Sequence, residues 1–159
     1  MATNSDIIRR FLTSPNRERY FPKGKHCGFE GDTFFSFGFP IAKLTPSRSK
    51  KAKLCFVTNR VFGNPYINQH IKILKDMSPW KIMQIDLANS MCFNLDTSVN
   101  NMSNTLAYYI KQHTSTQSTW HRNYFRMEAK RLFSILLEIH INYRPVAVVA
   151  RFKDVVKEF

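Results

Sequence analysis

Two early segments of the chain alternate hydrophobic and polar positions with a period of two, which is the pattern of a half-buried strand. The first covers residues 33–41, and we expect the side that carries Phe35, Phe37, Phe39 and Ile41 to be buried. Gly38 and Pro40 predict an edge position or a bulge near residues 38–40. The second covers residues 53–58, where apolar side chains on both faces indicate a more central strand. Turn residues between them predict an antiparallel hairpin.

Other segments repeat apolar residues every three or four positions, which predicts amphipathic helices. They cover residues 5–13, with Ser5 as a possible cap, and residues 65–75, after Asn64 and Pro65. Two more cover residues 98–112 and 120–141, the latter with an apolar stripe of Trp120, Tyr124, Met127, Leu132, Ile135, Leu136 and Ile139. The tail from residue 146 fits a strand at 145–149 or a helix, and we favour a helix at least from Ala150.

Residues 80–87 form a third predicted strand, and residues 17–26 have no clear period, so we expect a loop or extended arm there. The order of elements predicts an α+β fold with a small, mainly antiparallel sheet of about three strands, covered by helices. A chain of 159 residues suits one domain. Its expected parts are a helix and basic arm (1–28), a core of strands, hairpin and helix (29–88), and a helical part (98–159) with one long helix.

Two motifs within residues 33–75 carry a resemblance: Phe-Ser-Phe-Gly-Phe-Pro-Ile-Ala at 35–42 and Phe-Gly-Asn-Pro-Tyr-Ile-Asn-Gln-His at 62–70. This stretch resembles a family of uncharacterised phage and mobile-element proteins, in which an aromatic strand precedes a polar helix start. The family has no established activity. The resemblance therefore implies only a phage or mobile-element origin.

The charge of the chain points to polyanionic partners. Lys and Arg number 24 against 11 Asp and Glu, which gives a net charge of +13. Residues 1–60 carry +8, residues 61–110 carry 0 and residues 111–159 carry +5, so the two ends are basic. The composition disfavours mimicry of DNA and favours nucleic acid or a nucleoprotein complex as the partner.

Three groups of cations are the candidate nucleic-acid contacts. They lie in the arm, at the hairpin tip, and along one face of the long helix, where a step of about 6 Å suits a row of phosphates. The residues are Arg17, Arg19, Lys23 and Lys25, then Arg48, Lys50, Lys51 and Lys53, and finally Arg122, Arg126 and Lys130. In the arm, Tyr20 or Phe21 could stack on an unpaired base. The alternative is an ordinary solvated surface in all three places.

Catalytic and metal motifs are absent from the sequence. The five His and three Cys have no metal-ligand spacing, the carboxylates are not paired, and no glycine-rich phosphate loop occurs. His26 beside Cys27 could act as a nucleophile pair, but no third member supports it. We therefore expect no enzyme activity, no cofactor and no metal.

An odd number of widely spaced Cys is typical of reduced thiols in a cytoplasmic protein. No run of about 18 apolar residues and no signal peptide occurs, so we expect a soluble protein without membrane contact, in the host cytoplasm if phage-encoded. Two functional hypotheses follow. The first is a small, non-catalytic nucleic-acid-binding protein. The second is an interaction protein that binds and inhibits a host nucleoprotein machine, as anti-defence proteins of the anti-CRISPR type do.

Overall fold

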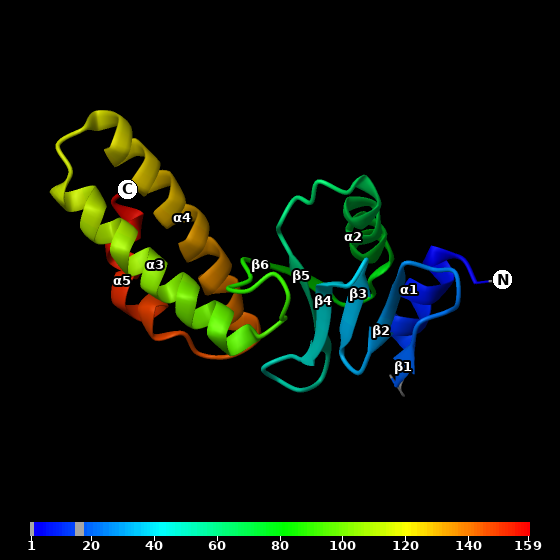
Figure 1. Ribbon diagram of the computed structural model, residues 1–159. Helices are drawn as coiled ribbons and strands as arrows, with labels where there is room; N and C mark the ends of the chain where they lie inside the picture. Colours follow the sequence, from blue (N-terminus) through cyan, green and yellow to red (C-terminus); the bar gives the residue numbers. More distant parts are fainter. Residues whose placement is uncertain (1, 15–17) are drawn as a thin grey trace. The chain divides into compact units, whose positions relative to one another are not determined.

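The computed structural model describes residues 2–14 and 18–159, and the chain forms two compact units, Met1–Asn94 and Leu95–Phe159. Each unit has its own secondary structure (Figure 1). In the described part of the chain, the first unit contains two helices and a sheet, and the second contains three helices. The expected single domain stays a prediction.

A six-stranded sheet forms the first unit, with its strands in sequence order. The strands are β1 (Arg19–Tyr20), β2 (Cys27–Glu30), β3 (Thr33–Ser36), β4 (Phe39–Pro46), β5 (Lys53–Thr58) and β6 (Lys81–Ile85). Each pair is antiparallel except β5 and β6, which are parallel. The α+β class and the mainly antiparallel sheet are confirmed, whereas the expected number of about three strands is too low.

Residues 33–41 are not one strand, as the alternation predicted, but a hairpin. Ser36 pairs with Phe39, and the two residues between them, Phe37 and Gly38, have φ values of 50° and 80°. Two successive left-handed residues form the type I′ turn that suits a tight hairpin. The strand reverses at Phe37, so Phe34 and Ser36 are the buried residues of β3, while Phe35 and Phe37 are only half-buried. The predicted buried face was therefore wrong for Phe35, Phe37 and Phe39, whereas Ile41 is buried as expected.

The strand β4 is interior, since it pairs with both β3 and β5, so the expected edge position for Pro40 was also wrong. A bulge does occur close to the expected place. The register jumps from Phe34↔Ala42 to Phe35↔Pro40, which leaves Ile41 as the extra residue. The bulge explains why Pro40, Ile41 and Ala42 are all buried although they are consecutive.

The predicted hairpin between residues 33–41 and 53–58 is confirmed in its second half, because β4 and β5 are antiparallel with Pro46 opposite Lys53. The chain then passes through α2 (Pro65–Met77) and returns as β6, parallel to β5. A parallel return needs a crossover, and α2 provides it. The helix begins as expected, with Asn64 accepting a hydrogen bond from the Tyr66 amide and Pro65 in the first turn.

The sequence analysis missed two strands, β1 within the predicted arm at 17–26 and β2 directly after it. β1 is only two residues long, and β2 contains Gly28, so neither shows an alternating pattern. Gly28 is required by close packing. A Cβ atom there would lie 2.4 Å from the Tyr20 carbonyl oxygen and 2.4 Å from the Phe21 ring.

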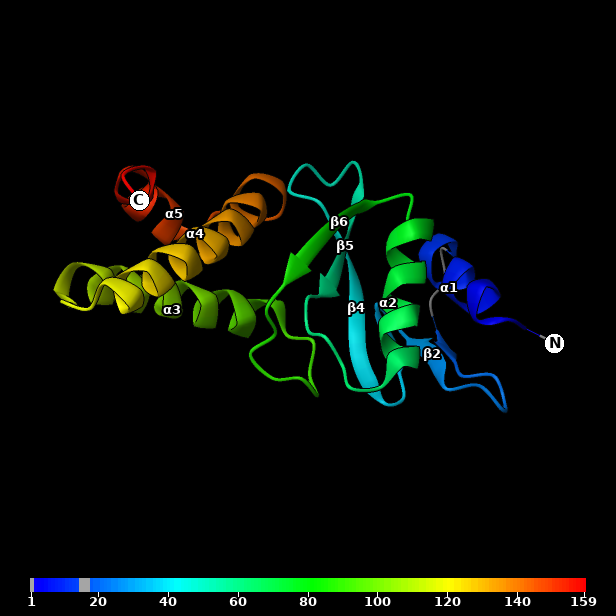
Figure 2. The same ribbon diagram turned by 90° about the horizontal axis from the view of Figure 1, so that it is seen from above.

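Two helices, α1 (Asn4–Thr13) and α2, lie on one face of the sheet (Figure 2). Thr3, and not Ser5 as expected, caps α1 in a capping box with Asp6. The predicted apolar faces of both helices are confirmed. Ile7, Ile8, Phe11 and Leu12 from α1 and Ile67, Ile71 and Leu74 from α2 join strand residues such as Phe29, Phe34 and Leu44 in the core.

The second unit consists of α3 (Leu95–Ser115), α4 (Thr119–Asn142) and α5 (Ala147–Lys157). The expected helices are present, and α3 is longer at both ends than predicted. The tail is a helix from Ala147, so the strand alternative for 145–149 was wrong. On α4 the buried residues are Ala129, Leu132, Leu136 and Ile139. The first part of the predicted stripe is instead exposed, with Trp120 and Met127 at 71% and 66%.

Candidate functional site

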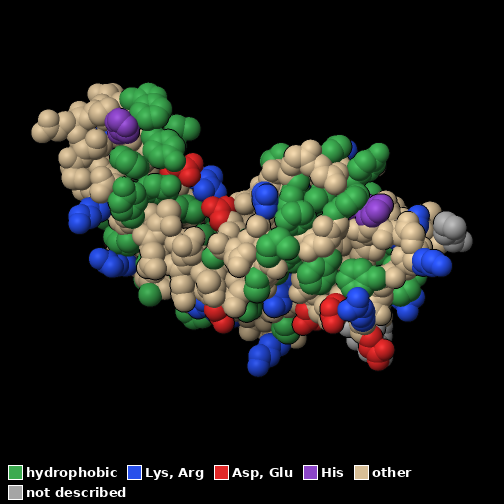
Figure 3. Space-filling view, in the orientation of Figure 1, with side chains coloured by type: hydrophobic (Ala, Val, Ile, Leu, Met, Phe, Trp, Pro, Cys, Tyr) green, Lys and Arg blue, Asp and Glu red, His purple; other side chains and the backbone are tan. Residues whose placement is uncertain are grey.

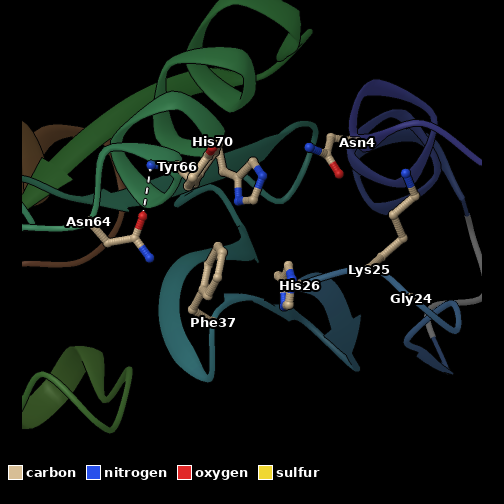
Figure 4. Close-up of a pocket in the computed structure, with 8 residues that line it drawn as sticks. All are labelled: Asn4, Gly24, Lys25, His26, Phe37, Asn64, Tyr66 and His70. Carbon is tan, nitrogen blue, oxygen red and sulfur yellow. Dashed lines mark hydrogen bonds between the residues drawn. The ribbon is translucent and has the colours of Figure 1, made fainter.

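A cavity of about 580 Å³ opens in the first unit, at the end of the sheet where α1 and α2 begin (Figure 4). It lies between the first turns of the two helices, the β3–β4 turn and the segment that precedes β2. Its lining residues are Asn4, Gly24, Lys25, His26, Phe37, Asn64, Tyr66 and His70. Lys25 is the only lining residue with a permanent charge among the described residues, so the cavity favours an anionic or aromatic ligand.

Aromatic rings form one wall of this cavity. The His26 and Phe37 rings are stacked with their centroids 4.5 Å apart and an interplanar angle of 13°. The centroids of the Tyr66 and His70 rings each lie 6.3 Å from the centroid of the Phe37 ring, with interplanar angles of 26° and 20°, respectively. The left-handed Phe37 is what places the ring there, and its amide donates to the His26 carbonyl at 2.7 Å. Residues in such sparsely populated conformations cluster at functional sites, which makes Phe37 a candidate site residue.

His70 is the buried polar residue of the site, with an exposed fraction of 2%. Its Nδ1 atom lies 2.7 Å from the Ser36 hydroxyl oxygen, and one of the two atoms donates a hydrogen bond to the other. Burial, with a further effect of the nearby His26, lowers the pKa of His70. His70 is therefore neutral at neutral pH, and Nδ1 is engaged with Ser36 while the ring faces the cavity (Figure 4).

The lowered pKa of His70 predicts that stability decreases as the pH falls. The unfolded chain takes up a proton near the ordinary value of 6.5, whereas the native state resists protonation, so acid favours unfolding below that pH. We expect the melting temperature to fall between pH 7.5 and 5.5, and to fall less in His70→Gln. Part of the pH dependence of stability should remain in this variant, because burial also lowers the pKa of His113. If the melting temperature of His70→Gln falls as much as that of the wild type over this pH range, the assignment to His70 is contradicted.

The neighbouring Cys27 does not form a nucleophile pair with His26. Burial raises the pKa of Cys27 to about 11, so the thiol stays protonated at neutral pH. Its Sγ donates to Asn4 Oδ1 at 3.7 Å, whereas the His26 ring stacks on Phe37. Cys27, Cys55 and Cys92 are all free thiols, as the sequence predicted.

The cations predicted in the arm have different surroundings. Lys25 lines the cavity, and Lys23 is exposed two residues before it. Arg19 is exposed on β1, pairs with Glu30 at 3.9 Å and lies over the Phe21 ring. Arg17 lies outside the described residues. Tyr20 and Phe21, the predicted stacking residues, pack within the unit against Phe29 and Phe35, respectively.

The other two predicted groups lie on the surface of their own units. Arg48, Lys50 and Lys51 are exposed in the turn between β4 and β5, and Lys53 at the start of β5 lies over the Trp80 ring at 5.8 Å. In the second unit Arg122, Arg126 and Lys130 are exposed along α4, and Arg122 donates to the Thr116 carbonyl at 3.0 Å. Of the predicted cations that the structure describes, only Lys25 lines the cavity.

Sequence reasoning missed Phe37, Tyr66 and His70 as site residues. His70 falls between Ile67 and Ile71 on the buried face of α2, so its position already marked it as an unusual polar core residue. Phe37 gave no such signal, since the turn lacks the Asn-Gly or Asp-Gly pair typical of this hairpin. Tyr66 follows the cap of α2 and is 62% exposed. Figure 3 shows hydrophobic side chains and a histidine at the surface of this part of the first unit.

No group of three or more His, Cys, Asp or Glu side chains in residues 2–14 and 18–159 is arranged to hold a metal ion. Within the same part of the chain, no helix has both the length and the apolar character needed to cross a membrane.

No protein-family model, curated protein or solved structure matches this chain. The functional assignment therefore depends on the geometry of the site and on the charge of the chain.

Proposed function

We propose that the protein binds single-stranded nucleic acid without catalysis, by stacking an unpaired base on the rings of the cavity and by contacting phosphates with its cations. The observation that carries this proposal is the wall of Tyr66, Phe37 and His26 beside Lys25. Aromatic platforms next to cations are what proteins use to bind unpaired strands. The resemblance of residues 33–75 supports a phage or mobile-element origin, with action in the host cytoplasm.

The charge of the protein supports the same class of partner. A net charge of +13 gives a non-specific attraction to phosphates that weakens with salt. Lys23, Arg48, Lys50 and Lys51 add exposed cations on the first unit, where the ring wall also lies. Stacking on rings then favours single strands over duplexes, because only unpaired bases present a free face.

Tyr66→Ala tests the proposal with little risk to the fold, because this side chain is 62% exposed. Loss of one stacked base costs about 1–3 kcal/mol, so we expect about 5- to 150-fold weaker binding of a labelled single-stranded oligonucleotide, measured by fluorescence anisotropy. Tyr66→Phe should keep most of the affinity.

A matched control is Tyr108→Ala, which removes a tyrosine of similar exposure (53%) from the second unit. It should leave binding unchanged. Equal affinity of the wild type and Tyr66→Ala, or equal affinity for single strands and duplexes, would contradict the stacking role.

A second candidate function has its own observation. On α4 the side chains of Trp120 and Tyr124 are exposed and stack in parallel at 6.1 Å, with Met127 exposed one turn further on. An exposed apolar surface of this kind favours an interaction protein that binds a host nucleoprotein machine. A pull-down from host lysate with nuclease treatment distinguishes the two candidates, since a protein complex survives the nuclease and a nucleic-acid tether does not.

A further inference from the structure

We propose that the cavity of the first unit binds one nucleotide by its phosphate monoester, with Lys25 and the Nε2–H group of His70 on the phosphate and Tyr66 against the base. This inference rests on the proposed function for the class of ligand. It adds that the site recognises a phosphate group that ends a nucleotide, either a free mononucleotide or the phosphorylated end of a strand.

The first support is the hydrogen-bonding state of His70. The side chain is 98% buried, and the described residues offer Nε2 no hydrogen-bond partner, although Ser36 engages Nδ1. Nε2 is therefore reachable from the cavity and available to donate a hydrogen bond to a ligand there. A phosphate oxygen selects the tautomer in which Ser36 donates to Nδ1 and Nε2–H donates into the cavity. Figure 4 shows the His70 ring directed toward the space between Asn4 and His26.

The second support is the charge around the cavity. No carboxylate is among its described lining residues, and Lys25 provides a cation at its rim. The N-terminus of α2, with Asn64 and Tyr66 in the lining, adds the positive end of a helix dipole. The N-terminus of α1 adds less, because the Asp6 carboxylate accepts from the Thr3 amide there. The anion is therefore expected at Lys25 and His70, and Tyr66 at the start of α2 is left for the base.

The third support is size together with the ring wall. A volume of about 580 Å³ holds a single nucleotide and is too small for a run of several. The Phe37 and Tyr66 rings are 6.3 Å apart, closer than an inserted base requires, so the base stacks on the exposed Tyr66 ring. A ligand with a phosphate at one end and an aromatic ring at the other matches this distribution.

The experiment measures binding of four probes to the full chain by isothermal titration calorimetry or anisotropy. The probes are adenosine, AMP, and the same short oligonucleotide with a 5′-phosphate or a 5′-hydroxyl. We expect AMP to bind at least 10-fold more tightly than adenosine. If the phosphorylated oligonucleotide also binds at least 10-fold more tightly than its hydroxyl form, the source is a strand end, whereas a gain for AMP alone identifies a free nucleotide.

Three variants test the residues. Lys25→Gln should weaken binding of AMP about 10-fold, whereas the control Lys72→Gln, an exposed lysine of α2 outside the cavity, should not. The side-chain amide of Asn takes roughly the position of the His Nδ1 atom, and that of Gln takes the position of Nε2. His70→Asn therefore keeps the contact with Ser36 and loses the group that faces the ligand. We expect His70→Asn to lose AMP binding and His70→Gln to retain most of it. Melting curves should show that both variants are folded.

The outcomes separate this inference from the proposed function. Strands that bind equally well with or without the 5′-phosphate, together with no preference for AMP over adenosine, would overturn the phosphate site and leave single-strand binding intact. Binding of AMP without any affinity for strands would retain the site and remove the proposed function. Equal loss of AMP binding in His70→Asn and His70→Gln would show that His70 acts only in the core, and would overturn its role as a donor.

Discussion

Phe34→Ala is expected to lower the free energy of unfolding by about 3–5 kcal/mol, because it removes a large ring from the centre of the core. The Phe34 side chain is fully buried, and its ring lies 5.3 Å from that of Phe11, which joins the sheet to α1. The cavity left by the ring is surrounded by strand and helix residues that cannot collapse into it easily. Urea denaturation measured by circular dichroism gives the value directly.

Phe35→Ala is the matched control, since it removes the same side chain from the next residue of β3. Phe35 is half-buried and its ring contacts Phe21 at 6.0 Å, at the exposed face of the strand. We expect it to lose clearly less stability than Phe34→Ala. Similar losses for the two variants, or a larger loss for Phe35→Ala, would mean that the faces of β3 are reversed.

Neutralisation of the cation groups is expected to have the largest effect on binding to nucleic acid. Replacement of Arg48, Lys50 and Lys51 by Gln, or of Arg122, Arg126 and Lys130, removes three of the proposed phosphate contacts in each case. Each lost contact should flatten the plot of log affinity against log salt by about 0.7–0.9, so each triple variant should change the slope by about 2–3. Anisotropy titrations at several salt concentrations measure this slope.

A control triple variant of Lys72, Lys75 and Lys81 removes the same charge from the middle of the chain, where the net charge is zero. It should change the slope little. Stability should also change little in all three variants, because eight of the nine charges are exposed, Lys75 is partly exposed, and surface charges contribute weakly to folding. A slope that stays unchanged in both basic variants would remove these surfaces from the interface and favour the interaction-protein candidate.

The sequence by itself determined the elements whose signals are local. The start of α2 follows from Asn64 and Pro65, which cap and preorganise a helix without help from distant residues. The apolar faces of α1 and α2 follow from spacing alone, and the hairpin of β4 and β5 follows from two apolar runs around a polar turn. The same reading identified Arg48, Lys50 and Lys51 as exposed cations.

The tertiary structure decided what depends on residues far apart in the chain. The alternation of apolar and polar residues over 33–41 fits one long strand as well as two short ones. Only the pairing of Ser36 with Phe39 revealed the turn at Phe37. The cavity exists because that turn, the segment before β2 and the first turns of α1 and α2 meet at one end of the sheet. His70 gained its role from Ser36, which lies 34 residues away, and no pattern within α2 contains that contact.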